Sequence, residues 1–181
     1  MDALEMLKNR RSIRQFKKEQ IKDEELNAVI EAGMYAPTAM NLQSPLIVAI
    51  QNEEDVKKMN ELSLEVMNRG GGINRGGLPY YGAPTIIVIF STSLAKTPLL
   101  GVLDASSVTT NMLNAAYALG LGGVWINRAK EIFEGEEGKK LLNKWGIKEE
   151  VVGVASIALG YKDCADPLPK ARREGYYKII K

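Results

Sequence analysis

The chain of 181 residues carries a net charge of +2, with 45% apolar and 25% charged residues, which is typical of one soluble globular domain over residues 1–181. It contains no histidine and a single cysteine, Cys164, which excludes a histidine-based acyl-transfer triad, a paired-cysteine zinc or redox site and an intrachain disulfide. The chain starts without a signal-peptide pattern, and its longest apolar run, 86–90, is far shorter than the roughly twenty residues of a membrane span, so we expect a cytoplasmic protein.

The first half of the chain predicts three helices and one strand. A short helix over residues 2–9 ends just before an arginine-rich segment. Asp23 is a suitable N-cap for a second helix, which Pro37 ends because the residue before a proline resists the α conformation. The apolar run 46–50 predicts a buried strand, and the helical spacing of apolar residues predicts a third helix over 53–67.

The second half predicts strands and helices in alternation. A glycine-rich segment, residues 69–77, rules out a regular element, and we expect a mobile loop or lid there. The other predicted elements are strands over 84–90, 124–126 and 151–159, helices over 104–119 and 136–145, and a tail over 166–181. Helices come first and strands and helices then mix, so the order favours an α+β fold with helical layers on a sheet.

The arginine-rich segment groups three guanidinium groups and a hydroxyl, those of Arg10, Arg11, Ser12 and Arg14. Three cations so close repel one another, and an anion would relieve that cost. Guanidinium groups suit a dianionic phosphate particularly well. The alternative is a solvated basic patch at a helix end, where cations are mildly favoured.

Two further segments are polar or basic without being decisive alone. Residues 37–45 form a loop rich in amide and hydroxyl groups, and they are also compatible with an ordinary capped turn. Residues 170–173 form a second basic cluster, which is compatible with an exposed tail or with a share in the same phosphate. The glycines at 120–123 follow a helix and precede a strand, the reverse of the dinucleotide-binding order.

Taken together and in order, five segments resemble the FMN-dependent nitroreductase family. The segments are residues 10–16, 36–45, 81–84, 119–126 and 170–172. They occur in the family's order and spacing, and the resemblance runs from about residue 4 to about residue 173. It implies an α/β/α sandwich with a mainly antiparallel central sheet, in an intertwined homodimer with FMN at the interface.

The resemblance also assigns flavin contacts, residue by residue. Arg10, Arg11 and Ser12 would hold the phosphate and ribityl end of FMN, joined by Lys170 and Arg172. Arg14 would lie along the pyrimidine edge, near N1. The partner subunit would contribute Pro37, Thr38, Ala39 and Asn41, with Gln43 nearby. The segment formed by Ile126, Asn127 and Arg128 would pass the N5 edge, with a backbone N–H aimed at N5.

The implied activity needs no catalytic side chain and no metal. FMN would take a hydride from NADH or NADPH and pass electrons to a small acceptor of nitroaromatic, quinone or enone type, in a ping-pong cycle. A cation near N1, the place of Arg14, would stabilise the negative charge of reduced flavin. Hydride transfer at N5 requires no histidine, so the composition is consistent with this reading.

Some positions depart from the family pattern, and two other functions stay open. Thr38 stands where many relatives have serine, and either Asn127 or Arg128 stands where many have glycine. The first alternative is a flavin-binding carrier or sensor without turnover. The second is a nucleic-acid binder that uses Arg10–Arg14 and the glycine–arginine loop, although the small net charge does not favour it.

Overall fold

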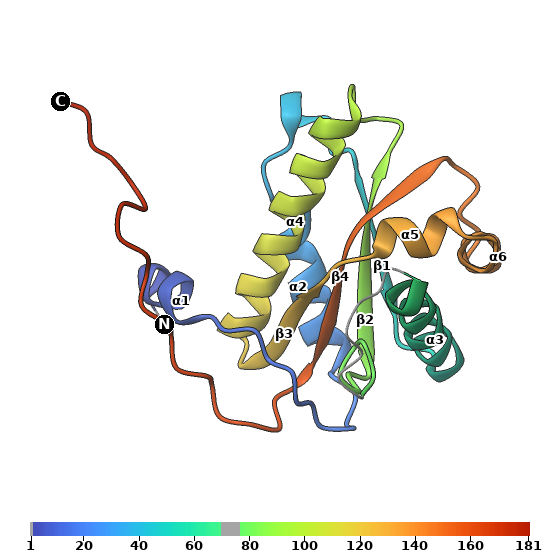
Figure 1. Ribbon diagram of the computed structural model, residues 1–181, viewed down its shortest axis with the longest axis horizontal. Coiled ribbons are helices and arrows are strands. Elements are labelled where there is room, and N and C mark those ends of the chain that lie inside the picture. The colour runs from blue at the N-terminus through green and yellow to red at the C-terminus, as the bar shows by residue number, and fades with distance from the viewer. Residues whose placement is uncertain (1, 70–76) are drawn as a thin grey trace.

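The computed structural model describes residues 2–69 and 77–181, which form a four-stranded sheet with helices on both faces (Figure 1). The elements are α1 (Ala3–Asn9), α2 (Asp23–Met34), the 3₁₀ turn η1 (Ala39–Asn41), β1 (Pro45–Ile50), α3 (Glu53–Arg69), β2 (Thr85–Thr92), α4 (Pro98–Ala118), β3 (Leu121–Ile126), α5 (Ala129–Glu134), α6 (Glu136–Lys144) and β4 (Val151–Tyr161). The strand order is β1-β2-β4-β3, and every neighbouring pair is antiparallel. The predicted α+β sandwich with an antiparallel sheet is confirmed.

Strand β2 lies inside the sheet and sends alternate side chains into two hydrophobic cores. Ile86, Val88 and Phe90 pack in the core that contains residues of α3, α5 and α6. Ile87 and Ile89 pack in the core that contains residues of α2 and α4. Because both faces of the strand are covered, β2 is apolar at successive positions instead of alternating with polar residues.

Helix α4 begins six residues earlier than the sequence predicted. Thr97 is its N-cap, and the Thr97 hydroxyl accepts a hydrogen bond from the N–H of Leu100 at 3.2 Å. Pro98 occupies the first turn, where its missing N–H costs nothing. A threonine followed by proline is a helix-start signal, and the prediction of a start at Asp104 overlooked it. Helix α5, with six residues, was not predicted at all.

The N-cap predicted for the second helix was wrong by one residue. Helix α2 starts at Asp23, and Lys22 is the capping residue. The backbone N–H of Lys22 donates to Glu25 Oε2 at 2.9 Å, so a glutamate inside the first turn satisfies it.

Three strands also differ from prediction. Strand β1 was expected to be buried, but it is an edge strand in which Ile50 alone is fully buried. Strand β3 begins at Leu121, and β4 continues through Gly160 to Tyr161. Gly122, Gly123 and Gly160, which suggested strand boundaries, are therefore inside strands, where neighbouring side chains approach closely.

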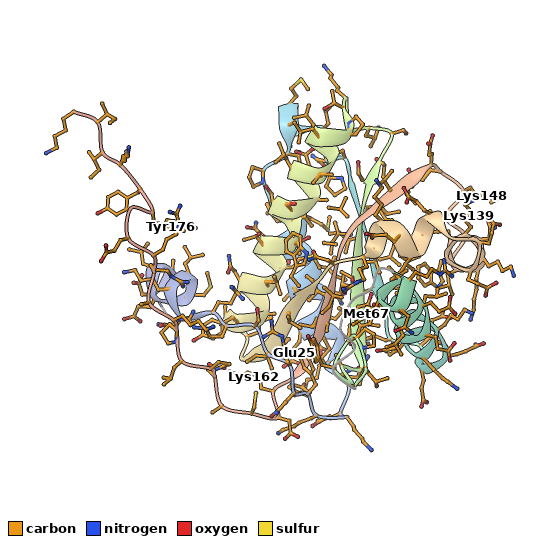
Figure 2. The ribbon with its side chains drawn as sticks, viewed as in Figure 1. Glu25, Met67, Lys139, Lys148, Lys162 and Tyr176 are labelled. Carbon is orange, nitrogen blue, oxygen red and sulfur yellow. The ribbon has the colours of Figure 1, made fainter. Side chains whose placement is uncertain are left out.

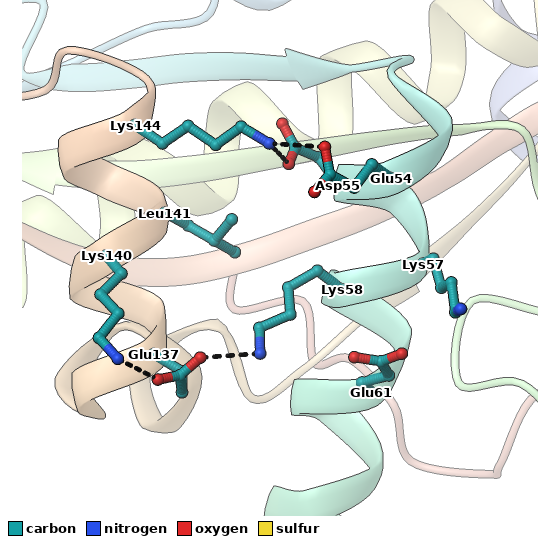
Figure 3. A pocket seen from close by; sticks show the side chains of 9 residues that line it. All are labelled: Glu54, Asp55, Lys57, Lys58, Glu61, Glu137, Lys140, Leu141 and Lys144. Carbon is teal, nitrogen blue, oxygen red and sulfur yellow. Dashed lines mark hydrogen bonds and ion pairs between the residues drawn. The ribbon is translucent and has the colours of Figure 1, made fainter.

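A groove of about 370 Å³ between α3 and α6 is lined almost entirely by charged side chains (Figure 3). Lys144 Nζ lies 2.7 Å from Asp55 Oδ1 and 3.2 Å from Glu54, and Trp145 Nε1 donates to Asp55 Oδ2 at 3.0 Å. Burial raises the pKa of Asp55, but the hydrogen bonds from Lys144 and Trp145 outweigh it, and the pKa is lowered overall. These contacts join the two helices, so we interpret the groove as a structural contact.

Replacing Glu137 by glutamine is expected to lower the melting temperature at pH 7 and to have little effect near pH 2. The Lys140 and Lys58 ammonium groups, at 2.6 and 2.8 Å, lower the pKa of Glu137 from 4.5 to about 2 (Figure 3). A lowered folded-state pKa stabilises the fold above pH 4.5, and this contribution is lost as the pH falls through about 2. Melting curves of both proteins between pH 2 and 7 test it, and a pH-independent difference would contradict it.

Beyond β4 the chain continues as an extended tail. Figure 2 shows Lys162 near the end of the sheet and Tyr176 far from it, on the tail. Residues 165–181 are exposed. Among the helices described, none is both long and apolar enough to cross a membrane. The predicted glycine-rich lid falls mainly on residues 70–76, which lie outside the described parts of the chain.

Candidate functional site

The arginine-rich segment docks on strand β3. Ser12 forms a parallel bridge with Gly123, and the N–H of Ile13 donates to the Gly123 carbonyl at 3.1 Å. Phe16 bridges to Lys162 at the end of β4. The Ile13 side chain is buried, so it anchors the segment while the neighbouring arginines remain at or near the surface.

Arg10 and Arg11 form a pair of cations with no carboxylate within 4 Å, as far as residues 2–69 and 77–181 show. Burial lowers the pKa of the Arg10 guanidinium, and the charge of Arg11 lowers it further. Arg11 Nη1 donates to the carbonyls of Lys8 and Arg10 at 2.9 and 2.7 Å, so Arg11 also caps α1. Its Nε is buried and lacks a partner in the described chain.

The surroundings of Arg10 and Arg11 are compatible with both interpretations of the arginine cluster. Arg11 is the helix-end cation of the alternative reading, and it still has one N–H without an acceptor. Arg10 has no hydrogen-bonded carboxylate partner in the described residues, and its charge is destabilised by its surroundings. An anion with several acceptor oxygens would satisfy both groups, and these residues fit the predicted phosphate.

Arg14 is exposed and stacks on a residue that the sequence analysis did not assign to the site. Its guanidinium carbon lies 5.8 Å from the centre of the Tyr81 ring, a cation–π distance. Tyr81 has a left-handed backbone, with φ of 56°, in the turn before β2. The contact places Arg14 beside the turn.

The predicted flavin-contacting loop has an unusual backbone. Met40, Asn41 and Gln43 all adopt left-handed conformations, with φ of 53°, 53° and 51°. For most residues other than glycine such a conformation costs about 1–2 kcal/mol, and for asparagine less. The Thr38 hydroxyl accepts the N–H of Gln43 at 3.1 Å and so closes the loop on itself.

A second missed residue, Asp104, holds this loop from helix α4. Asp104 Oδ1 accepts the N–H of Ala39 at 2.8 Å, and Oδ2 accepts the hydroxyl of Ser44 at 2.8 Å. The sequence analysis treated Asp104 as the start of a helix, and no local pattern shows that its partners lie 60 and 65 residues away. Pro37 precedes the clamped part of the loop and is exposed.

The segment at the end of β3 is held by a buried pair of hydroxyl groups. Ser156 donates to the carbonyl of Ile126 at 3.3 Å, and the Tyr80 hydroxyl lies 3.0 Å from Ser156 Oγ. Burial raises the pKa of Tyr80 to about 12, against smaller opposing effects of Ser156 and the Arg128 charge. The peptide between Ile126 and Asn127 is planar, so fixing its carbonyl also fixes the direction of the Asn127 N–H.

The backbone of Arg128 shows why glycine would suit the position that follows β3 by two residues. Arg128 has a left-handed backbone, with φ of 80°, which glycine adopts without steric cost. The side chain of Asn127 accepts a hydrogen bond from Trp125 Nε1 at 2.8 Å. Trp125 therefore supports the segment through its ring nitrogen while it packs against the core of α2 and α4.

The predicted site residues form separate groups within one chain. Asp104 ties the loop to the second turn of α4, whereas Ser12 pairs with Gly123, which lies beside Leu113 and Ala116 in the last turns of that helix. From Asp104 to Ala116 the helix rises by about 18 Å. Lys170 and Arg172 are exposed on the tail, with no hydrogen bond or ion pair to the arginine segment in the described residues.

The chain matches known proteins over most of its length. The sequence model of the Nitroreductase family matches residues 7–161. A protein of Archaeoglobus fulgidus, provisionally named NADH dehydrogenase/NAD(P)H nitroreductase, is 33% identical over 162 residues, which are 88% of this chain and 85% of the relative. The NADPH-flavin oxidoreductase of Vibrio harveyi is 29% identical over 90% of this chain and 66% of its own.

The fold is also similar to that of solved structures. The crystal structure of a nitroreductase with bound FMN from Bacteroides fragilis covers all of both chains, with a TM-score of 0.87 and 28% identity. An FMN-dependent nitroreductase from Clostridium difficile covers 99% of this chain and 98% of its own, with a TM-score of 0.81 and 26% identity.

Proposed function

Because this chain belongs to the nitroreductase family, we propose that it is an NAD(P)H-dependent FMN oxidoreductase that reduces a small acceptor. The observation that carries the proposal is the pair Arg10 and Arg11, two cations without a carboxylate partner in the described chain and with one buried N–H unsatisfied. Bound FMN would supply the hydride chemistry, accepting from NADH or NADPH and donating to the acceptor.

The chain's own residues would bind and orient the cofactor. Arg10, Arg11 and Ser12 would hold the phosphate, with Lys170 and Arg172 from the tail. Arg14, held against Tyr81, would place a positive charge at the pyrimidine edge. The Ile126 carbonyl, held by Ser156, would leave the Asn127 N–H directed at the N5 edge. Arg128 follows directly and would border the same edge.

We further propose that the working unit is a homodimer. Within one chain, the loop containing Pro37, Thr38, Ala39, Asn41 and Gln43 is held at the opposite end of α4 from the arginine segment (Figure 1). A loop contributed by a second copy would place both groups at one flavin. Exposed apolar side chains on the outer face of α4, those of Leu99, Val102 and Leu103, are consistent with such contact.

The acceptor would be a nitroaromatic, a quinone or an enone, reduced in a ping-pong cycle. A single pocket over the flavin would then serve donor and acceptor in turn, and no further side chain would need to gain or lose a proton for the hydride step. Steady-state rates at several fixed acceptor concentrations test this order, with parallel double-reciprocal lines expected. Intersecting lines would contradict it.

The first experiment is a visible absorption spectrum of the purified protein reconstituted with FMN, followed by anaerobic addition of NADH or NADPH. We expect flavin bands that bleach with at least one donor. Bands that stay oxidised with both donors would replace the proposal by a flavin carrier or sensor. A protein that takes up no FMN would overturn it.

A further inference from the structure

Asp104 is a buried carboxylate, 4% exposed, with both oxygens committed to one loop. Oδ1 accepts from the backbone N–H of Ala39 and Oδ2 from the hydroxyl of Ser44, each at 2.8 Å. Ala39 and Ser44 stand at the two ends of the left-handed stretch. A single side chain of α4 therefore joins the beginning of the loop to its end.

The loop needs such support because its conformation is intrinsically unfavourable. Met40, Asn41 and Gln43 have positive φ, yet all three side chains are exposed, so burial does not explain the conformation. Backbone held in sparsely populated regions persists only where the surroundings enforce it, and it concentrates at functional sites. The Thr92 hydroxyl adds a hydrogen bond to the Ser44 carbonyl at 2.7 Å and fixes the far end further.

The described hydrogen-bond partners of the Asp104 side chain are all neutral. In the described residues no Lys or Arg nitrogen lies within 4 Å of it, so the buried carboxylate is held by neutral donors only. Burying an unpaired charge is unfavourable, and hydrogen bonds to a carboxylate are correspondingly strong. An asparagine of the same shape would accept from Ala39, but it could not accept from both donors with two oxygens.

We propose that Asp104 is a positioning residue that shapes residues 38–44 to contact the flavin ring of FMN. The inference rests on the proposed function. Asp104 would act only through Ala39 and Ser44, without touching the cofactor. Since the loop would contact the ring and not the phosphate, replacing Asp104 should weaken the binding of FMN and that of riboflavin, which lacks the phosphate, to the same extent.

The test uses Asp104→Ala, Asp104→Asn and Ser44→Ala, with Thr109→Val as the matched control. Thr109 is also buried on α4, and its hydroxyl bonds only within the helix, to the Ala105 carbonyl at 2.7 Å. We expect Asp104→Ala to raise the dissociation constants of FMN and riboflavin equally, by about tenfold, and to change the visible circular dichroism of the bound flavin. Asp104→Asn should lie between Asp104→Ala and wild type, and Thr109→Val should keep both constants within about twofold.

The possible results test the proposed function and the role of Asp104 separately. Wild type without FMN binding overturns the proposed function itself. Wild type that binds FMN, with variants that are folded and bind both flavins equally well, overturns only the role of Asp104. A rise for FMN alone would also overturn it, because that pattern indicates the phosphate. If Asp104→Ala does not fold, Ser44→Ala is the deciding variant. We expect it to raise the dissociation constants of FMN and riboflavin by about threefold, and unchanged constants would contradict the role of Asp104.

Discussion

Replacing Arg10 by alanine is expected to raise the dissociation constant of FMN by about 10- to 100-fold while leaving that of riboflavin almost unchanged. A hydrogen bond to a charged group contributes about 1.5–3 kcal/mol, and about 1.4 kcal/mol corresponds to a tenfold change in affinity. Arg10 is the better choice than Arg11, because Arg11 also caps α1 and its loss would disturb the helix. Titration of the apoprotein with each flavin, followed by fluorescence, measures both constants.

The control for the loss of one positive charge is Lys139→Ala. Lys139 is exposed on α6 and pairs with Glu136 at 2.8 Å within the described chain. Its removal should leave both constants unchanged. Arg172→Ala addresses the tail in the same assay and should weaken FMN alone if the tail reaches the phosphate. Equal losses of FMN and riboflavin affinity in Arg10→Ala would exclude a phosphate contact.

Replacing Gly122 by valine is expected to destabilise the fold by about 3 kcal/mol and to weaken FMN binding as well. A Cβ at this position would lie 2.8 Å from Ile13 Cγ2 and 2.9 Å from Lys162 Cγ. Removing a strand glycine would by itself stabilise by about 0.5–1 kcal/mol, so the clash decides the sign. Because Ile13 anchors the arginine segment, its displacement also moves Arg10 and Ser12.

Gly123→Ala is the control on the opposite face of the same strand. Its Cβ would meet the end of the Leu113 side chain at 3.0 Å, and it would not contact the arginine segment. We expect Gly123→Ala to change stability modestly and FMN affinity not at all. Urea unfolding and flavin titration of both variants separate the two effects. A Gly122→Val protein with wild-type FMN affinity would show that the docking of Ile13 does not control the phosphate contact.

Local patterns predicted most of the helices and strands and singled out the arginine segment. Strand β2 was evident because both of its faces are buried, and the arginine segment was evident because its residues are adjacent in sequence. The start of α4 depended on two residues, Thr97 and Pro98, outside the apolar pattern that defined the helix. Element ends are decided by such single capping contacts.

The contacts of Asp104 and Ser156 could not be predicted from the sequence, for a different reason. Asp104 is separated in sequence from Ala39 by 65 residues and from Ser44 by 60. Ser156 lies 30 residues from Ile126 and 76 from Tyr80. Each is an ordinary residue within a helix or strand, and its partners become apparent only when the sheet and α4 have been assembled.

The docked arginine segment has a consequence for the behaviour of the protein without its cofactor. Strand β3 is one edge of the sheet, and residues 12–13 cover part of that edge through a backbone hydrogen bond to Gly123. Uncovered edges of apolar strands pair readily with other chains. The arginine segment therefore also shields this edge of the sheet from intermolecular pairing. Displacement of residues 12–13 from β3 would then expose a free strand edge and favour aggregation, separate from any effect on turnover.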